Sequence, residues 1–261
     1  MPSRKVCAAV IAGATAETAI PAPPLQGQRT DSVERLPGGS GARITPSSAV
    51  MITRPAFSPP DGFRLLPGYF DRAQQEALID AVFAAADAGA PFFQPTMPRT
   101  GQPLSVTMTN FGPLGWVTDR AKGYRYEKTH PETGLPWPAM PEALLTLWDA
   151  VSNYPAPPEA CLVNWYRADS RMGLHVDFDE EATDAAVVSI SLGDKARFRV
   201  GGPERKGPTA SMVLSSGDVV VLGGAARRSY HGVDRIYPGT STLVPGGGRI
   251  NLTLRRVTIP G

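Results

Sequence analysis

Histidine is scarce in this chain, and one histidine stands beside several carboxylates. The 261 residues include three histidines, His130, His175 and His231. His175 lies in the stretch HVDFDE, two residues before Asp177, so on an extended segment both side chains point to the same side. Two such ligands and a distant histidine make the two-histidine, one-carboxylate arrangement. That arrangement binds non-haem Fe(II) and leaves coordination positions open for a substrate and O₂.

The third ligand must be one of the two remaining histidines. His130 lies in EKTHPETG, whose helix-breaking residues indicate a loop, and we expect this histidine to be structural or exposed. His231 lies near the end of DVVVLGGAARRSYHGV, after a strand and a turn, and precedes the strand-like stretch RINLTLR by a short connection. We therefore predict a metal site formed by His175, Asp177 and His231.

Alternation of polar and apolar residues suggests a second site. In RINLTLR the polar residues are Arg249, Asn251, Thr253 and Arg255. A solvated face is the ordinary explanation of such a strand. The alternative is that the polar face lines an interior, where buried arginines require anions. In CLVNWY, Asn164 and Tyr166 share one face in the same way. An interior lined by both strands would hold a ligand with two acidic groups.

The elements that position these residues change in type along the chain. Asp71 as N-cap, Gln74 three residues later and Gly89 at the end predict a helix in FDRAQQEALIDAVFAAADAG. Pro141 fits the first turn of a second helix, in MPEALLTLWDAVSNY. Beyond Pro158 the pattern has period two, in the segments CLVNWY, VVSISLG, ARFRV, ASMVL, DVVVLGG and RINLTLRRV. Helices followed by many strands predict an α+β chain, an antiparallel barrel or jelly roll with helices outside.

Composition narrows the classes of protein. The hydrophobic share of 42% and the charged share of 19% are ordinary for a globular domain. A net charge of +2 is too mild to indicate a polyanionic partner by itself. Cys7 and Cys161 cannot build a disulfide framework, which favours a reducing, cytoplasmic location. No apolar run approaches the roughly 20 residues that span a bilayer, so we expect no membrane partner.

The N-terminal segment differs from the rest of the chain. Residues 1–52 are rich in Pro, Gly, Ser and Thr and lack apolar periodicity. Such a segment cannot bury enough surface to offset its chain entropy, and we expect a disordered extension. The basic start and Ala-rich stretch leave a secretory signal as the alternative. Residues 53–261 are expected to form one domain.

Taken together, these motifs resemble the AlkB family of Fe(II)- and 2-oxoglutarate-dependent dioxygenases, which reverse alkylation damage in nucleic acids. The matching segments are NWY, HVDFDE, YHG and RINLTLR, joined upstream by SVTMTNFGPLGW, GYRY and PWPAMPEAL. The resemblance implies a double-stranded β-helix, or jelly roll, over about residues 158–258, with flanking N-terminal helices. It also implies a nucleotide-recognition lid over about residues 95–130.

The resemblance assigns Fe(II) to the three residues that the spacing selects. It implies that 2-oxoglutarate is bound by Asn164, Tyr166, Arg249, Asn251 and Arg255. Arg249 would pair with the far carboxylate, and Arg255 would lie near the other carboxylate and near Asp177. Arginine suits this task because its planar fork binds a carboxylate through two hydrogen bonds.

The resemblance also implies a pocket for the substrate base. Its residues are Met108, Trp116, Tyr124, Tyr126, Asp179, Glu180 and Arg205. Trp116 and a metal-ligating histidine would sandwich the base, and Asp179 would accept a hydrogen bond from its exocyclic amine. The ordinary alternatives are that the aromatic residues fill a core and that the charged residues are solvated. Four basic residues of the lid could contact phosphates, namely Arg120, Lys122, Arg125 and Lys128.

The implied reaction is oxidative demethylation of 1-methyladenine and 3-methylcytosine in single-stranded DNA, and in RNA by extension. 2-Oxoglutarate and O₂ become succinate and CO₂, and formaldehyde is released. The expected partner of this monomer is an alkylated single strand. One alternative is a dioxygenase acting on a protein, lipid or small molecule, which would not need Trp116. Another is a non-catalytic jelly-roll binding module, which would not need an intact metal triad.

Overall fold

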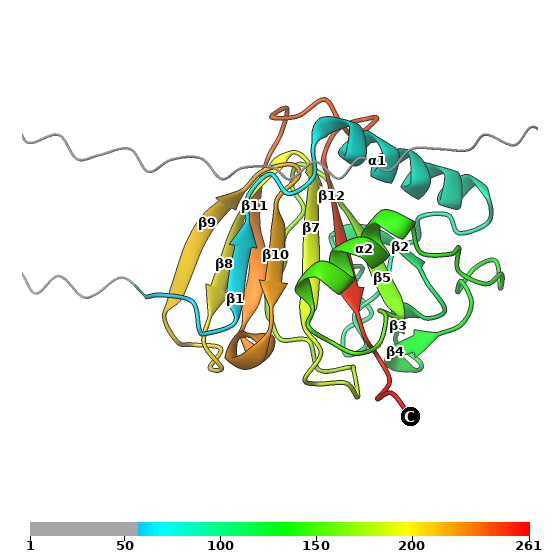
Figure 1. The fold of residues 1–261 in the computed structure, drawn as a ribbon. Helices are drawn as coiled ribbons and strands as arrows, with labels where there is room; N and C mark the ends of the chain where they lie inside the picture. The colour runs from blue at the N-terminus through cyan, green and yellow to red at the C-terminus, as the bar shows by residue number, and fades with distance from the viewer. Residues whose placement is uncertain (1–56) are drawn as a thin grey trace, which may run out of the picture. The chain divides into compact units, whose positions relative to one another are not determined.

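Two antiparallel sheets form the centre of the structure, a computed structural model that describes residues 57–261 (Figure 1). The larger sheet has the strand order β1-β10-β7-β12-β5-β2, and the smaller has the order β6-β11-β8-β9. A separate hairpin joins β3 and β4. The predicted extension over residues 1–52 lies outside the described residues.

The elements follow one another with the helices early and most strands late. In chain order they are β1 (Phe63–Leu66), α1 (Arg72–Asp87), β2 (Val106–Phe111), β3 (Gly115–Asp119), β4 (Gly123–Glu127), α2 (Glu142–Val151), β5 (Ala160–Tyr166), β6 (Met172–His175), β7 (Val187–Gly193), β8 (Lys195–Gly201), β9 (Thr209–Leu214), β10 (Val219–Leu222), η1 (Gly224–Arg228), β11 (His231–Tyr237) and β12 (Arg249–Arg255). This is the predicted α+β arrangement, and the two facing sheets make a jelly roll.

The local signals of the sequence fix the starts of both helices. The Asp71 side chain accepts a hydrogen bond from the Gln74 backbone N–H, and the Gln74 side chain accepts one from the Asp71 N–H, each 2.9 Å long. This reciprocal pair is the predicted capping box. Pro141 is the N-cap of α2, just before the first helical residue, where its missing N–H leaves no hydrogen bond unmade.

Both helices cover the outer face of the larger sheet (Figure 1). Leu78 and Val82 of α1 and Leu147 and Trp148 of α2 are buried in the same cluster as the apolar face of β12. That face carries Ile250, Leu252 and Leu254. Burial of each such side chain contributes about 1.5–3 kcal/mol, so the helices fix which face of β12 is turned outward.

A second cluster fills the space between the two sheets. Leu162 and Tyr166 of β5 meet Phe198 of β8 and Val233 of β11 there. Because side chains alternate along a strand, the polar residues of β12 point into this interior. All four are buried: Arg249, Asn251, Thr253 and Arg255. The inward orientation is confirmed, and the solvated-face alternative for β12 is wrong.

The period-two pattern identifies some strands and misses others. It reveals β5, β7, β8, β9, β10 and β12 within a few residues of their observed ends. It does not reveal β11, whose register shifts between Val233 and Arg235, because a bulge interrupts the alternation. Strand β6 has only 4 residues, too few to show a period. In residues 57–261 no helix is both long and apolar enough to cross a membrane.

Candidate metal centre, anion site and base platform

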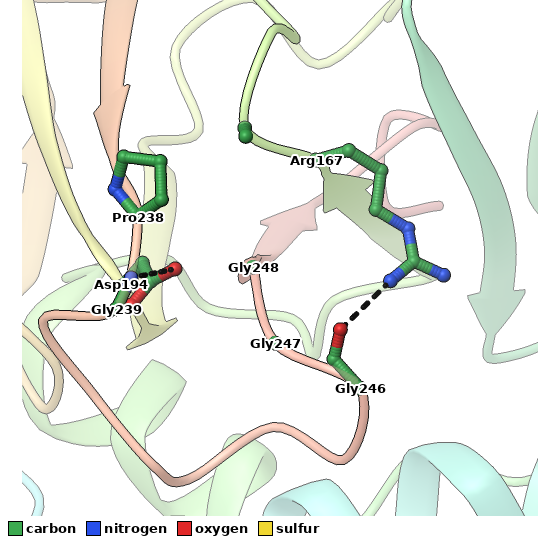
Figure 2. Close-up of a pocket in the computed structure, with 8 residues that line it drawn as sticks. Arg167, Asp194, Pro238, Gly239, Gly246, Gly247 and Gly248 are labelled. Atoms are coloured by element: carbon green, nitrogen blue, oxygen red, sulfur yellow. Dashed lines mark hydrogen bonds between the residues drawn. The ribbon is translucent and has the colours of Figure 1, made fainter.

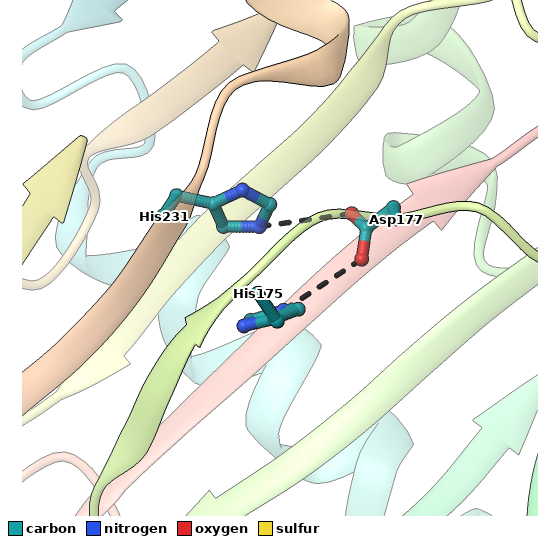
Figure 3. Close-up of side chains that lie close together, drawn as sticks. All are labelled: His175, Asp177 and His231. Carbon is teal, nitrogen blue, oxygen red and sulfur yellow. Dashed lines mark ion pairs between the residues drawn. The ribbon is translucent and has the colours of Figure 1, made fainter. Parts of the chain in front are cut away.

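Three side chains from two neighbouring strands converge on one point (Figure 3). His175 ends β6 and His231 begins β11, and the two residues face each other in the antiparallel register. Asp177 follows β6 by two residues. Its Oδ1 lies 3.6 Å from His175 Nε2, and its Oδ2 lies 3.7 Å from His231 Nε2. All three ligand atoms lie within 4.8 Å of one another, close enough to share one ion.

Backbone carbonyls orient both imidazole rings. The Nδ1 of His175 lies 2.9 Å from the Gly173 carbonyl, and the Nδ1 of His231 lies 3.0 Å from the Ser229 carbonyl. A proton on each Nδ1 makes these contacts hydrogen bonds and leaves the Nε2 lone pair free to bind a metal. Asp177 Oδ2 is buried without a hydrogen-bond donor. Two lone pairs and an unpaired carboxylate oxygen fit a divalent cation.

The charge states of these ligands suit metal binding. Burial raises the pKa of Asp177, but the neighbouring Arg255 and the two histidines outweigh it and hold this pKa well below its usual range. Burial lowers the pKa of His231 to about 4, against the opposing effect of Asp177. The carboxylate is therefore ionised and the imidazole neutral at pH 7, the forms that bind a metal.

Arg255 and Arg227 surround the metal-facing aspartate with a buried network of charges. Arg255 donates from Nη2 to Asp177 Oδ1 and from Nη1 to Glu180 Oε1, each over 2.7 Å. Arg227 donates from Nη2 to Glu180 Oε2 over 3.0 Å and from Nη1 to the Asp177 carbonyl over 3.1 Å. The Glu180 side chain has no exposed surface. The solvated alternative for Glu180 is therefore wrong, and its two oxygens are occupied by arginines.

A second set of polar atoms lies along the interior of β5 and β12. Arg249 pairs with Tyr166 in the register of the two strands. Its Nη2 donates to Ser191 Oγ over 2.9 Å, while its Nε and Nη1 are buried without partners. Asn164 Oδ1 is also buried without a partner. Unpaired buried N–H groups are costly, so the guanidinium fits an anionic ligand that completes its hydrogen bonds.

Burial leaves this anion site positively charged. It lowers the pKa of Arg249 to about 10, so the guanidinium stays protonated at neutral pH. It raises the pKa of Tyr166 to about 12, so the phenol keeps its proton and can donate it in a hydrogen bond. A dicarboxylate would find a cation and a neutral donor at this end of the interior.

Asn251 lies between the two arginines of β12, but its amide is already engaged. It donates to Ser189 Oγ and to the Ile190 carbonyl, and its oxygen accepts a hydrogen bond from Thr253. These bonds tie β12 to β7 beside Arg249.

The β3–β4 hairpin carries the aromatic residues of the predicted lid. Trp116 donates its indole N–H to Asp179 Oδ2 over 2.8 Å. Its ring stacks on Tyr124, with centroids 5.5 Å apart and planes at 22°. Tyr124 is about half exposed. An indole held by its N–H two residues from Asp177 and stacked on a half-exposed ring could serve as a platform for a planar group.

Tyr126 lies directly opposite Trp116 in the hairpin, but it contacts different residues. Its hydroxyl donates to Glu180 Oε1 over 2.5 Å and accepts from Arg255 Nη1 over 3.2 Å. Burial raises the pKa of Tyr126 above its usual range. The charge of Arg255 opposes this rise, and the charge of Glu180 adds to it. The phenol is therefore a neutral member of the charge network.

The remaining substrate candidates lie in different surroundings. Met108 of β2 is buried opposite Asn164, within the cluster between the sheets. Arg205 is exposed in the β8–β9 connection. Arg125 is bound by Asp119 and Glu127, at 2.8 Å and 2.7 Å. The remaining basic residues of the predicted lid are exposed, namely Arg120, Lys122 and Lys128.

His130 has the structural role that the sequence allowed. It is buried, with Phe93 and Trp137 packed against its ring at centroid distances of 5.2 Å and 5.1 Å. Its Nε2 lies 2.9 Å from the Pro91 carbonyl, and its Nδ1 accepts backbone N–H groups of the following turn. No ring nitrogen is left for a metal.

Two surface hollows lie away from the metal ligands. One, of about 330 Å³, is lined by Arg167, Asp194 and the loop Gly246–Gly248, where Arg167 donates to the Gly246 carbonyl (Figure 2). The other, of about 380 Å³, includes Arg64 and Asn153 among its lining residues. Asp194 in the first hollow already accepts backbone N–H groups of Gly239 and Ser241. Its carboxylate is therefore engaged in holding a turn.

Sequence reasoning missed Arg227, Arg228 and Phe178. Arg227 is buried, although an arginine in a Gly/Ala-rich turn is usually solvated. Phe178, between Asp177 and Asp179, is 61% exposed, with the Arg228 guanidinium 5.7 Å from its ring centroid. The aromatic residue inside a run of carboxylates was the sequence signal that could have singled out Phe178.

Comparisons with known proteins agree with this geometry. A family model described as the 2OG-Fe(II) oxygenase superfamily matches residues 62–255. The chain is 56% identical over 208 residues to an alpha-ketoglutarate-dependent dioxygenase AlkB homolog of Caulobacter vibrioides, covering 79% of this chain and 92% of the relative. It is 42% identical over 171 residues to the alpha-ketoglutarate-dependent dioxygenase AlkB of Escherichia coli, covering 64% and 78%.

More distant relatives extend the comparison. A protein of Arabidopsis thaliana named DNA N(6)-methyladenine demethylase ALKBH1A is 34% identical over 122 residues, covering 44% of this chain and 35% of the relative. The solved structure of OsALKBH1 aligns with a TM-score of 0.62 at 29% identity, covering 77% of this chain and 98% of that chain.

Proposed function

We propose that this chain, which belongs to the AlkB family of the 2OG-Fe(II) oxygenase superfamily, oxidatively demethylates alkylated bases in single-stranded nucleic acid. It is a dioxygenase that uses Fe(II), 2-oxoglutarate and O₂ and forms succinate and CO₂. The proposed substrates are 1-methyladenine and 3-methylcytosine in DNA or RNA, and the methyl group leaves as formaldehyde.

One observation carries the nucleic-acid part of this proposal. The indole N–H of Trp116 bonds Asp179, two residues after the metal-facing Asp177, so an aromatic platform lies beside the metal ligands. Stacking on an aromatic ring suits any base. A methylated base that cannot pair costs less free energy to unstack from its neighbours than a paired base does.

His175, Asp177 and His231 are the proposed Fe(II) ligands. When bound, the metal supplies the redox chemistry that couples 2-oxoglutarate and O₂ to oxidation of the methyl group. These three residues would hold the metal through three protein ligands, and a metal bound in this way has positions left for the co-substrate. The carbonyls of Gly173 and Ser229 keep both imidazoles in the binding tautomer.

The interior of β5 and β12 is the proposed 2-oxoglutarate site. Arg249 would bind the far carboxylate with its two unpaired N–H-bearing nitrogens, helped by the Tyr166 hydroxyl. Asn164 and Arg255 would lie at the metal end, where Arg255 already holds Asp177. Asn251 would act indirectly, by fixing β12 against β7.

The base would be read by the hairpin and by Asp179. One Asp179 oxygen accepts the Trp116 N–H, which leaves the other to accept a hydrogen bond from the exocyclic amine of the lesion. A carboxylate at this place favours a cationic base, and both proposed lesions are cationic. Tyr124, stacked on Trp116, would extend the platform.

A dioxygenase acting on a protein or small molecule is the second candidate. It would keep the anion site but would have no use for the Trp116–Asp179 pair. Incubation with Fe(II), 2-oxoglutarate, O₂ and a methylated single-stranded oligonucleotide, followed by mass analysis, separates the two. Loss of the methyl group supports the proposal, provided that the His175→Ala variant leaves the oligonucleotide unchanged. Succinate formation with every methyl group retained would favour the second candidate.

We also propose that the protein works as a cytoplasmic monomer. The three residues that would hold the metal all come from one chain, which supports a monomer. A buried free cysteine, Cys161, suits a reducing compartment. Light scattering coupled to size-exclusion chromatography tests the monomer, and fluorescence microscopy of a tagged full-length chain tests the location.

A further inference from the structure

The hydroxyl of Tyr126 joins the β3–β4 hairpin to the buried charges around Asp177. It shares Nη1 of Arg255 with Glu180, since this nitrogen donates to the phenol at 3.2 Å and to the carboxylate at 2.7 Å. The other terminal nitrogen, Nη2, donates to Asp177 Oδ1 at 2.7 Å. The Arg255 guanidinium thus binds Tyr126 and Glu180 through Nη1 and binds Asp177 through Nη2.

We infer that Tyr126 is a positioning residue for Asp177, and that it couples the placement of the hairpin to the geometry of the metal and co-substrate site. The inference rests on the proposed metal site. A guanidinium is planar and rigid, so a shift at Nη1 also moves Nη2. Because the Arg255 side chain is 8% exposed, water has little access to replace a lost hydrogen bond.

Two side chains of the hairpin are hydrogen-bonded to the segment that follows Asp177. Trp116 and Tyr126 are directly paired across β3 and β4, and they donate to the consecutive carboxylates Asp179 and Glu180. Side chains so paired move together, because their strands are hydrogen-bonded. A base stacked on Trp116 would therefore act on Asp177 through Tyr126 and Arg255. Such coupling is reciprocal, so metal and 2-oxoglutarate must also steady the hairpin.

A simpler role for Tyr126 makes a different prediction. Its ring packs beside the cluster between the sheets, and a residue that only fills space needs no hydroxyl. Tyr126→Phe keeps the ring and removes the bridging oxygen. Tyr69→Phe is a matched control, because Tyr69 is 39% exposed and lies before α1, outside the proposed site.

Titration with Co(II), which has visible absorption bands that report ligand geometry, measures the effect without turnover. We expect Tyr126→Phe to weaken Co(II) binding about tenfold, the low end of what outer partners of metal ligands contribute, and to change the spectrum. The KM for 2-oxoglutarate should rise, and Tyr69→Phe should match the parent. A Tyr126→Phe protein with the parent's Co(II) affinity and spectrum would overturn the inference. A parent protein that binds no Co(II) would instead refute the proposed metal site.

Hydrogen exchange tests the reciprocal direction in each protein separately, so a change in overall stability does not confound it. Addition of Co(II) and 2-oxoglutarate should slow amide exchange in residues 115–127 of the parent and of Tyr69→Phe. In Tyr126→Phe this slowing should be lost. Equal slowing in all three proteins would show that the hairpin responds without the hydroxyl, and the coupling role would be wrong.

Discussion

Trp116 and Asp179 are joined by a 2.8 Å hydrogen bond between residues 63 positions apart in the chain. The bond turns the indole of the hairpin toward the segment that carries the metal-facing Asp177. The side chain proposed as a stacking platform and the side chain proposed to recognise the base thus constrain each other. Their contact makes several consequences of the proposed function measurable.

Removing one imidazole should abolish metal-dependent turnover. His175→Ala deletes one of three protein ligands, which disrupts the open coordination geometry. Its side chain is 39% exposed, so the fold should survive the change. Fe(II) binding and succinate formation check the loss, with Arg171→Ala, exposed and directly before the same strand, as control. Parent-rate consumption of 2-oxoglutarate by His175→Ala would refute the ligand assignment.

Arg249→Lys should weaken 2-oxoglutarate binding. An ammonium cannot reproduce a two-point contact with a carboxylate, and a hydrogen bond to a charged group contributes about 1.5–3 kcal/mol. The KM for 2-oxoglutarate should therefore rise by roughly ten- to a hundredfold, with a smaller change in kcat. The control is the exposed Arg235→Lys, which keeps charge and makes the same replacement. An unchanged KM in Arg249→Lys would point to another anion site.

Truncating Trp116 should separate demethylation from uncoupled turnover. Loss of a stacked base contact of roughly 1–3 kcal/mol should weaken binding of methylated single strands about ten- to a hundredfold. Conversion of 2-oxoglutarate without nucleic acid should persist in Trp116→Ala, because the anion site lies on β5 and β12. Trp116→Phe should recover part of the binding, since it keeps an aromatic ring but lacks the N–H.

If Trp116 only fills the core, its truncation leaves a cavity and costs about 3–5 kcal/mol of unfolding free energy. Both activities would then fall in parallel with the melting temperature. Measuring both turnovers and thermal unfolding on one preparation distinguishes this outcome from the loss of stacking.

Glu180→Gln should destabilise the fold. Glu180 neutralises Arg227 and Arg255 in the interior, and removing one partner of a buried ion pair costs about 3–5 kcal/mol. At roughly 2–4 °C per kcal/mol for a domain of this size, the melting temperature should fall by about 6–20 °C. The exposed neighbour gives the control Glu181→Gln, which should melt with the parent. Equal melting temperatures for both variants would contradict the network.

The same carboxylate predicts a dependence of stability on pH. Burial raises the pKa of Glu180, but Arg255, Tyr126 and Arg227 together outweigh it, and the folded-state pKa lies below the ordinary 4.5. The unfolded state then binds more protons, so the stabilisation is complete above pH 4.5 and is lost as the pH falls through the folded pKa. Denaturant unfolding at pH 6 and below 4.5 should show a larger loss for the parent than for Glu180→Gln. An equal loss in both proteins would assign the acid sensitivity to other groups.

The sequence alone determined both helices, most strands of the sheets and which residues share a strand face. Capping residues and hydrophobic spacing are local signals, and they identified α1 and the start of α2. Strand alternation is local too, so it put Asn164 on one face with Tyr166 and Arg249 on one face with Arg255, while their burial in the interior came from the fold. Three histidines leave few ways to complete a metal triad, which made His175 and His231 predictable.

Only the tertiary structure decided which charges are buried and with whom. Glu180 meets Arg227, Arg255 and Tyr126 across 47, 75 and 54 positions of the chain. A carboxylate or guanidinium is solvated by default, and it enters an interior only where folding brings its partner to the same place. No periodicity encodes that meeting, because it depends on how the hairpin, η1 and β12 pack. The residues that could bind a metal can be recognised from short sequence motifs. The network of buried charges that would hold them in place forms only when the chain folds.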